Sequence, residues 1–468
     1  MNQKELLFQF EEKYPFLYEI EANGVPVYTC FRDAMLSFLE NGDSGSNSFS
    51  EGSKGKVYPR RILKSILGFW KFRKKKTLIF TSSVYRRDYN RNLAAEWLMD
   101  RYEEAVIFEW PSRQDAYDQA IFSDEKRGHY CPIDFYLVLY KLYIRLQKKN
   151  YNILKVQCRD RLKKAFVIAP SPDTEGEKKA IQYLIDEMPD SYATTVLSQK
   201  LFQKMFRRYT KVERVVDFWG SARENIAPVI PTHPEVIELQ HGIITSYHPG
   251  YVYPSIAKKK CKKFFERKVL VYGENTRNTL VNESVFLSDK VEVIGNPRIE
   301  MYKKVFDSKE NEKKIFLFAS GAIGKHYYDK MIEYLSDIQS CMDKDPYWKD
   351  YRIAIKLHPR ENNDNIAKYK KVLPRALYYD NTSQLYELFG RSYVLLTLAS
   401  TALYEAAKFD VPTVTLDYYF DDITKIYGFD TWKISNKADV ENMLEKLKNK
   451  EEYHTYLRYL QEETIKFM

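Results

Sequence analysis

The chain of 468 residues has few cysteines and no long apolar run. The five cysteines are scattered and form no CxxC pair, which disfavours a disulfide framework or a zinc ribbon and predicts reduced thiols. No stretch of about 18 apolar residues occurs, so a transmembrane helix is not expected. Residues 1–16 contain acids and lack an uninterrupted apolar core, unlike a signal peptide. We expect a soluble, cytoplasmic protein.

Two further classes of site lack a sequence signal. Three histidines, His233, His241 and His248, lie close together, but no H-E-x-x-H pattern accompanies them, so no metal site is expected. The 74 basic and 64 acidic residues give a formal charge of +10, which favours anionic partners. Because the basic residues are dispersed and no groove-reading motif is present, nucleic acid is not an expected partner.

A basic amphipathic segment follows a Gly/Ser-rich stretch. Residues 42–55, GDSGSNSFSEGSKG, predict a mobile loop. In residues 56–77, apolar side chains recur at three- and four-residue spacing among lysines and arginines, which predicts a helix. Such a helix can dock on an anionic membrane surface at the inner face of the membrane. The alternative is an ordinary domain helix with a solvated lysine cluster.

Short β-type apolar runs alternate with longer helical patterns over the rest of the chain. The predicted strands are 77–83, 105–110, 165–170, 214–220, 235–240, 268–273, 291–297, 314–320, 351–359, 376–380, 393–400 and 412–417. Near-continuous aliphatic runs are typical of parallel strands buried on both faces. The pattern predicts an α/β protein with two Rossmann-like domains and a cleft between them. A polar break near 255–266 suggests an N-terminal acceptor domain over 1–260 and a C-terminal nucleotide-donor domain over 261–468, with terminal helices.

Ligands of parallel sheets bind beyond the carboxyl ends of the strands, so the residues after each strand are the candidates. His358, Pro359 and Arg360 follow the strand at 351–359, where proline ends the ladder. A histidine and an arginine at that point suit a phosphate as charged donors. The alternative is a histidine that caps a neighbouring loop.

Hydroxyls follow two other predicted strands. Ser400 and Thr401 precede a helix and offer hydroxyls and backbone amides to an anion. Glu405 is not part of a capping box, and either accepts hydrogen bonds from a ribose or is a plain solvated helix glutamate. Ser320 and Gly321 begin a glycine-containing loop that resembles a phosphate loop but fails the Walker pattern.

Two candidates for a general base lie in the first half. His241 follows the strand at 235–240, between Gln240 and Gly242, and is either a structural turn histidine or a group that faces a ligand. Glu175 follows the run at 165–170, where a carboxylate can serve as base. An acid in the first turn of a helix is the ordinary alternative.

Three motifs together resemble a known superfamily. ELQHG, KLHPR and the Ser-Thr pair followed by Glu405 resemble GT-B bacterial surface-polysaccharide glycosyltransferases that build capsule or lipooligosaccharide. The pattern is similar to polysialyltransferases and sialyltransferases, to capsule Kdo transferases and to teichoic-acid glycerophosphotransferases. The resemblance spans roughly residues 210 to 420.

The resemblance implies roles for individual residues. His358 and Pro359 match the His-Pro motif, which implies contact with the phosphate of a cytidine nucleotide, and Ser400 and Thr401 imply a second phosphate contact. His241 matches a His-Gly element that implies a base or phosphate ligand. The acidic pair of the sialyltransferases is interrupted here, since Thr174 precedes Glu175. The base therefore stays open between Glu175 and His241.

The expected activity is a metal-independent transfer of sugar from a CMP-linked nucleotide donor to a glycan or glycolipid acceptor. The donor is a substrate, and no cofactor is expected. The alternatives are a CDP-polyol phosphotransferase of teichoic-acid or capsule type, a non-catalytic capsule-assembly subunit and a nucleotide-sugar epimerase.

Overall fold

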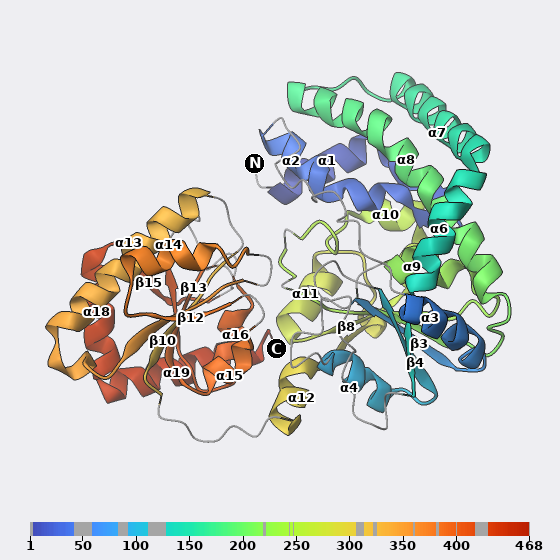
Figure 1. Ribbon diagram of the computed structural model, residues 1–468. Helices are drawn as coiled ribbons and strands as arrows, with labels where there is room; N and C mark the ends of the chain where they lie inside the picture. Colours follow the sequence, from blue (N-terminus) through green and yellow to red (C-terminus); the bar gives the residue numbers. More distant parts are fainter. Residues whose placement is uncertain are drawn as a thin grey trace. The chain divides into compact units, whose positions relative to one another are not determined.

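The chain forms two α/β units, each with its own parallel sheet and core (Figure 1). The first unit comprises Met1–Gly295 and the second Asn296–Met468. The computed structural model describes residues 3–41, 59–82, 92–110, 128–218, 221–242, 244–246, 248–305, 313–321, 325–358, 361–380, 383–398, 400–416 and 429–467.

The sheet of the first unit has seven parallel strands in the order β5-β4-β3-β6-β7-β8-β9. The strands are β3 (Thr77–Ser82), β4 (Ala105–Trp110), β5 (Tyr130–Pro132), β6 (Arg214–Asp217), β7 (Glu235–Leu239), β8 (Lys268–Val271) and β9 (Val291–Val293). Side chains of β3 alternate between two cores, since Leu78 and Phe80 pack into one and Ile79 into the other. Apolar side chains on both faces explain the near-continuous hydrophobic runs.

Helices pack on both faces of this sheet. They are α3 (Pro59–Lys71), α4 (Leu93–Arg101), α6 (Asp134–Leu146), α8 (Glu175–Phe206), α9 (Ser221–Asn225), α10 (Ser255–Lys260) and α11 (Glu274–Asn282). Helix α7 (Lys148–Ile168) packs on α8 instead. Phe72, Phe202 and Phe206 pack against β3 and β4 on one face, and Leu98 of α4 packs on the other.

The N-terminal segment adds a further helical layer to the first unit. It contains α1 (Gln3–Lys13), η1 (Pro15–Glu19), the hairpin of β1 (Glu21–Ala22) and β2 (Val25–Pro26), η2 (Val27–Phe31) and α2 (Arg32–Asn41). Its apolar side chains share a core with Val269 and Val271 of β8. The segment is therefore an integral part of the first unit.

The sheet of the second unit has six parallel strands in the order β12-β11-β10-β13-β14-β15. The strands are β10 (Ile315–Ala319), β11 (Arg352–Lys356), β12 (Leu377–Tyr379), β13 (Ser392–Thr397), β14 (Thr413–Leu416) and β15 (Trp432–Ile434). Helices α13 (Lys325–Lys344), α14 (Asn365–Val372), α15 (Leu385–Phe389), α16 (Ala402–Ala407), α18 (Lys437–Lys448) and α19 (Lys450–Ile465) lie on both faces of the sheet (Figure 1). Helix α12 (Pro297–Val305) begins the unit, and its Tyr302 contacts the ring of Tyr386 on α15.

The two parallel sheets confirm the predicted α/β class with two Rossmann-like units, and eleven of the predicted strands are present. The strand predicted at 165–170 is wrong, because residues up to Ile168 belong to α7 and the apolar side chains of Val167 and Ile168 are exposed. A short apolar run does not distinguish a strand from a helix end. The predicted cleft between the domains stays a prediction.

The predicted domain boundary at 260/261 differs from the division at Gly295/Asn296. The reason is the pairing of β8 with β7 and of β9 with β8, which assigns residues beyond 260 to the first sheet. The polar break at 255–266 is therefore a connection within the first unit, formed by α10 and η5 (Lys262–Glu266).

The basic amphipathic segment contains the predicted helix, observed as α3. The loop predicted at 42–55 lies outside the described residues. Among the helices of the described ranges, none combines the length and apolar character that crossing a membrane requires.

Candidate functional site

Three predicted donor-binding residues lie at the carboxyl ends of neighbouring strands in the second unit. Ser320 follows β10, His358 follows β11 and Ser400 follows β13, and β10 lies between the other two strands. The chain runs outward from β10 to β12 and then returns to β13 on the other side, so the order reverses between β10 and β13. Ligands of open parallel sheets bind at such a reversal.

The ends of β10 and β11 are joined by side-chain hydrogen bonds. The backbone N–H of His358 donates to the hydroxyl of Ser320 at 2.8 Å and to Oε2 of Glu361 at 2.8 Å. The Ser320 hydroxyl in turn donates to the same carboxylate oxygen of Glu361. These three groups form a closed arrangement in which His358 begins the turn and Glu361 ends it.

Glu361 is buried, and a second set of partners holds its other oxygen. The hydroxyl of Tyr328 on α13 donates to Oε1 at 2.6 Å, and the amide of Asn365 donates to the Tyr328 hydroxyl at 2.7 Å. A buried carboxylate is stabilised only when such donors replace its water. Glu361 therefore fixes the backbone of His358 and the side chain of Ser320.

A buried cation lies at the same strand ends. Lys356 is the last residue of β11, only 5% exposed, and its ammonium group donates to the carbonyl of Leu357 at 2.5 Å. The carbonyl of Lys356 accepts the backbone N–H of Ser320 at 3.0 Å. The strand ends therefore bring a lysine close to Ser320 and His358, which suits an anionic ligand.

Ser400 uses its hydroxyl oxygen to accept the backbone N–H of Ala402 at 3.2 Å, and Thr401 caps α16 without a side-chain hydrogen bond. The helix predicted after this pair is present but spans only Ala402–Ala407. Glu405 lies within this helix and is buried. The alternative prediction, a plain glutamate exposed to solvent, is therefore wrong.

Of Pro359, Arg360 and Gly321, the remaining predicted phosphate-site residues of this edge, only Gly321 is among the described residues. Pro359 and Arg360 lie outside the described residues. Gly321 is half-buried next to Ser320, and the described chain stops there before α13. Their roles at the phosphate stay predictions.

In the first unit, Gln240 fixes the turn that carries His241. Its side-chain carbonyl accepts the backbone N–H of Tyr272 at 2.7 Å, and its amide donates to the carbonyl of Gly242 at 2.8 Å. One glutamine therefore links the end of β8 to the turn after β7. Glycine is not required by packing at Gly242, because an added Cβ would meet no atom within 4 Å.

His241 is exposed and contacts a buried tyrosine. Its Nδ1 lies 3.5 Å from the hydroxyl of Tyr251. Although the ring reaches solvent, desolvation by the surrounding protein holds the pKa of His241 below its usual value, with Arg223 acting in the same direction and Glu238 against it. A neutral imidazole at near-neutral pH can accept a proton.

Glu238 of β7 is the buried anion behind this pair. Its Oε2 accepts Arg223 at 2.6 Å and Arg267 at 2.7 Å. Burial alone would raise the pKa of Glu238, but the two arginines outweigh it and lower the pKa to about 2. The carboxylate therefore stays ionised.

Glu175 has a different setting. It begins α8, lies at the surface and pairs with Lys178 at 3.2 Å. The strand that placed it at a sheet edge is absent, so only the resemblance supports a role as base. The adjacent Gly176 has a packing reason, since an added Cβ would lie 3.0 Å from the carbonyl oxygen of Phe38.

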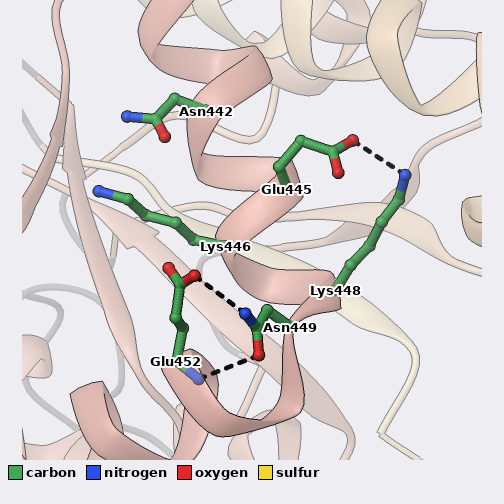
Figure 2. Close-up of a pocket in the computed structure, with 6 residues that line it drawn as sticks. All are labelled: Asn442, Glu445, Lys446, Lys448, Asn449 and Glu452. Carbon is green, nitrogen blue, oxygen red and sulfur yellow. Dashed lines mark hydrogen bonds and ion pairs between the residues drawn. The ribbon is translucent and has the colours of Figure 1, made fainter.

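A surface hollow at the turn between α18 and α19 is unrelated to these residues. It is lined by Asn442, Glu445, Lys446, Lys448, Asn449 and Glu452 (Figure 2). Asn449 caps α19 by accepting the backbone N–H groups of Glu451 and Glu452, and Lys448 pairs with Glu445 at 2.9 Å. These polar groups serve the helix junction, which gives the hollow a structural explanation.

Sequence reasoning missed Glu361, Lys356 and Tyr251. The first two lie within two or three residues of His358, so a search of the whole turn for buried charges would have found them. Tyr251 lies ten residues beyond His241, and only the fold brings the two together. Within the described ranges, no group of three or more His, Cys, Asp or Glu side chains could hold a metal ion.

No protein-family model and no curated protein matches the chain. Among solved structures, it is similar to a UDP-GlcNAc 2-epimerase from Neisseria meningitidis bound to UDP-GlcNAc, with 14% identity, coverage of 84% of this chain and 94% of that one, and a TM-score of 0.46. It is also similar to the wall teichoic acid polymerase TagF, with 12% identity, coverage of 87% of this chain and 91% of that one, and a TM-score of 0.46. A glycosyltransferase from Rickettsia africae ESF-5 has 10% identity to the chain, with coverage of 84% of this chain and 94% of that one and a TM-score of 0.46.

Proposed function

We propose that the chain is a glycosyltransferase that moves a sugar from a CMP-linked donor to a bacterial surface glycan. The observation that carries the proposal is the position of Ser320, His358 and Ser400 at the carboxyl ends of three neighbouring strands. They flank the reversal of strand order, where a nucleotide is the expected ligand. The buried Lys356 supports an anionic ligand at the same edge.

In the proposed reaction, the acceptor hydroxyl oxygen bonds to the anomeric carbon while the bond from that carbon to the donor phosphate oxygen breaks. The hydroxyl proton passes to a base, and CMP leaves with the electron pair of the broken bond. His358, Ser400 and Thr401 stabilise the charge that develops on the phosphate. Glu405 is proposed to contact the ribose, and Pro359, Arg360 and Gly321 to shape the phosphate site.

We favour His241 over Glu175 as the base. His241 follows a strand of the first sheet and has a lowered pKa, so its neutral form persists near neutral pH. Glu175 is exposed on a helix end and is already paired with Lys178. A Glu175→Gln variant should therefore retain activity, and a His241→Gln variant should lose it.

Calorimetry with CMP, CDP, UMP, UDP and GDP tests the donor class. We expect CMP or CDP to bind selectively and His358→Ala to weaken binding at least tenfold, since a charge-assisted contact contributes about 1.5–3 kcal/mol. His454→Ala on α19 is the matched control, because His454 is exposed and far along the chain from the strand ends. Binding of UDP or GDP alone would overturn the cytidine donor.

Product analysis tests the reaction itself. Incubation with CMP-sugars and glycan acceptors should release CMP and extend the acceptor. Release of CMP together with transfer of a polyol phosphate from a CDP-polyol would instead identify a phosphotransferase. A folded protein that binds no nucleotide would favour the non-catalytic role in capsule assembly.

We also propose that α3 makes peripheral contact with an anionic membrane at the inner face. Leu63, Leu67 and Trp70 on α3 are 59%, 60% and 55% exposed. Residues 59–76 contain eight lysines or arginines and no acid. An exposed apolar stripe among cations is typical of a helix that lies in the interface of anionic lipids.

A further inference from the structure

We infer that α6 joins α3 in a single membrane-docking face, which binds an anionic lipid bilayer as one preformed surface. This α3–α6 face consists of Leu63, Leu67 and Trp70 on α3 and Val138, Leu142 and Leu146 on α6. It rests on the membrane contact proposed for α3 and is independent of sugar transfer.

Exposed apolar side chains are concentrated in this part of the first unit. Fourteen large apolar side chains are exposed in the described residues, and ten of them lie on α3, α6 and α7. The other four are isolated on four different segments. Single exposed apolar residues are normal, but a cluster of this kind marks an interaction surface.

The outer side of α6 has the pattern of a helix that lies on a lipid surface. Val138, Leu142 and Leu146 recur at four-residue spacing, so they lie on one side of the helix, where they are 39%, 52% and 72% exposed. Lys141 and Arg145 are also exposed and alternate with them along the helix. Long basic side chains can keep their charges at the lipid headgroups while neighbouring apolar groups enter the acyl region.

The apolar stripes of α3 and α6 point away from the same core. Phe69 of α3 and Tyr136 of α6 pack into one core on the same face of the sheet, and the two helices lie next to each other (Figure 1). Ser65 and Gly68 are buried on the inner side of α3, opposite Leu67. The outer sides of both helices therefore form one continuous surface.

Direct contacts hold the two helices together. Arg61 of α3 donates to both carboxylate oxygens of Asp134, the first residue of α6, at 2.9 and 3.0 Å. The hydroxyl of Ser65 accepts the backbone N–H of Phe135 at 3.3 Å. A Cβ at Gly68 would collide with a side chain of β5, so the close approach of α3 requires glycine there. The face is therefore formed before it meets lipid, and binding does not have to order it.

The charge of the α3–α6 face selects its ligand. Residues 59–76 contain eight lysines or arginines and residues 135–149 contain four, and neither segment contains an acid. Asp134, which precedes the second segment, is buried and paired with Arg61. A second copy of the chain would present the same cations, which disfavours a dimer through this face. Anionic headgroups complement the cations, and the acyl chains accept the apolar stripes.

The test is co-sedimentation of the full chain with vesicles of phosphatidylglycerol and phosphatidylcholine. The α6 variant is Leu142→Gln with Leu146→Gln, since glutamine has a helix propensity close to that of leucine. We expect this variant to bind at least about tenfold more weakly than wild type. The matched control is Val372→Gln with Ile465→Gln, which removes two exposed apolar side chains from α14 and α19 and should bind like wild type.

A second variant of α6 tests the electrostatic part. Lys141→Gln with Arg145→Gln changes only exposed side chains and leaves the apolar stripe intact. We expect binding to the anionic vesicles to fall at least about fivefold, and the remaining binding to depend less on salt than that of wild type.

The outcomes separate this inference from the earlier proposals. If the α6 variant bound like wild type while Leu67→Ser with Trp70→Ser bound weakly, the inference would be overturned and the contact through α3 would stand. Equal binding of wild type to vesicles of phosphatidylcholine alone would overturn the anionic ligand. If wild type bound no vesicles, both membrane proposals would be overturned, and a dimer abolished in the α6 variant would identify the face as an interface between copies. Sugar transfer is tested separately by product analysis.

Discussion

The backbone N–H of His358 donates to the hydroxyl of Ser320 across 2.8 Å, which joins the turn after β11 to the end of β10. Both groups also contact the carboxylate of Glu361. The geometry of the candidate phosphate site therefore depends on a residue that need not touch the ligand.

Glu361→Gln should destabilise the second unit. The glutamine side chain keeps one acceptor oxygen but has an NH₂ group in place of the other. That NH₂ group would face N–H or O–H donors, either those of His358 and Ser320 or that of Tyr328. We expect the free energy of unfolding to fall by about 1–3 kcal/mol in urea titrations. Glu333→Gln is the control, since Glu333 is an exposed partner of Lys330, and an equal loss in both variants would contradict the assigned role.

Stability should depend on the ionisation of Glu238. Its folded pKa, about 2, lies below the ordinary value of 4.5. The contribution is therefore fully present above pH 4.5 and is lost as the pH falls toward 2, with a total of about 3 kcal/mol. The difference in unfolding free energy between wild type and Glu238→Gln should be constant from pH 7 to about pH 5 and narrow toward pH 3.

Glu235→Gln provides the comparison for this pH series. Glu235 lies on the same strand, β7, but its side chain is exposed and only 4.0 Å from Arg214. We expect the unfolding free energy of Glu235→Gln to differ little from that of wild type, and this difference to change little with pH. If the difference in unfolding free energy between wild type and Glu238→Gln stayed constant down to pH 3, the arginines would not be holding that carboxylate ionised.

Membrane contact through α3 should depend on its exposed apolar stripe. Replacing Leu67 and Trp70 by Ser should lower binding to phosphatidylglycerol-containing vesicles at least tenfold in sedimentation, because each buried apolar side chain contributes about 1.5–3 kcal/mol. Leu287→Ser is the control, because Leu287 is an exposed leucine outside α3, and we expect this change to leave vesicle binding close to that of wild type. Wild-type binding should also weaken as salt rises, and equal binding to neutral vesicles would refute the electrostatic part.

Arg32→Met should be among the more destabilising single changes in the first unit. Arg32 and Glu11 are both almost fully buried, with Nε and Oε1 2.6 Å apart, so the variant leaves a buried carboxylate without its charge partner. The expected loss is about 3–5 kcal/mol in chemical unfolding. Arg145→Met, an exposed change on α6, should stay close to wild type.

The sequence predicted the sheets better than the chemistry around them. Runs such as 314–320 and 393–400 are apolar on both faces, which is a strong signal for a buried parallel strand. The run at 165–170 has the same composition at the end of a helix, and nothing local separates the two cases. Strand pairing across 30 residues, as between β7 and β8, likewise required the fold to locate the domain boundary.

The candidate site shows the same division. His358, Ser320 and Ser400 could be predicted because each follows a strand in the sequence. The contacts of Glu361 with Tyr328 and of His241 with Tyr251 join residues that lie far apart in the sequence, so no local sequence pattern predicts them. The prediction for Glu175 depends partly on a strand at 165–170 that the structure replaces with the end of α7, and the surface ion pair with Lys178 gives this glutamate an ordinary explanation.

The contact between Arg32 and the carbonyl of Pro249 joins residues 217 positions apart. The guanidinium also lies 4.0 Å from the ring centroid of Tyr253. During synthesis, Arg32 and Glu11 leave the ribosome long before the loop 248–253 exists, so the first helices cannot reach their final packing until most of the first unit has emerged. Closing so long a segment is slow. We therefore expect the geometry around Tyr251 to be completed late in folding, so that the chain's earliest residues are among the last to reach their final packing.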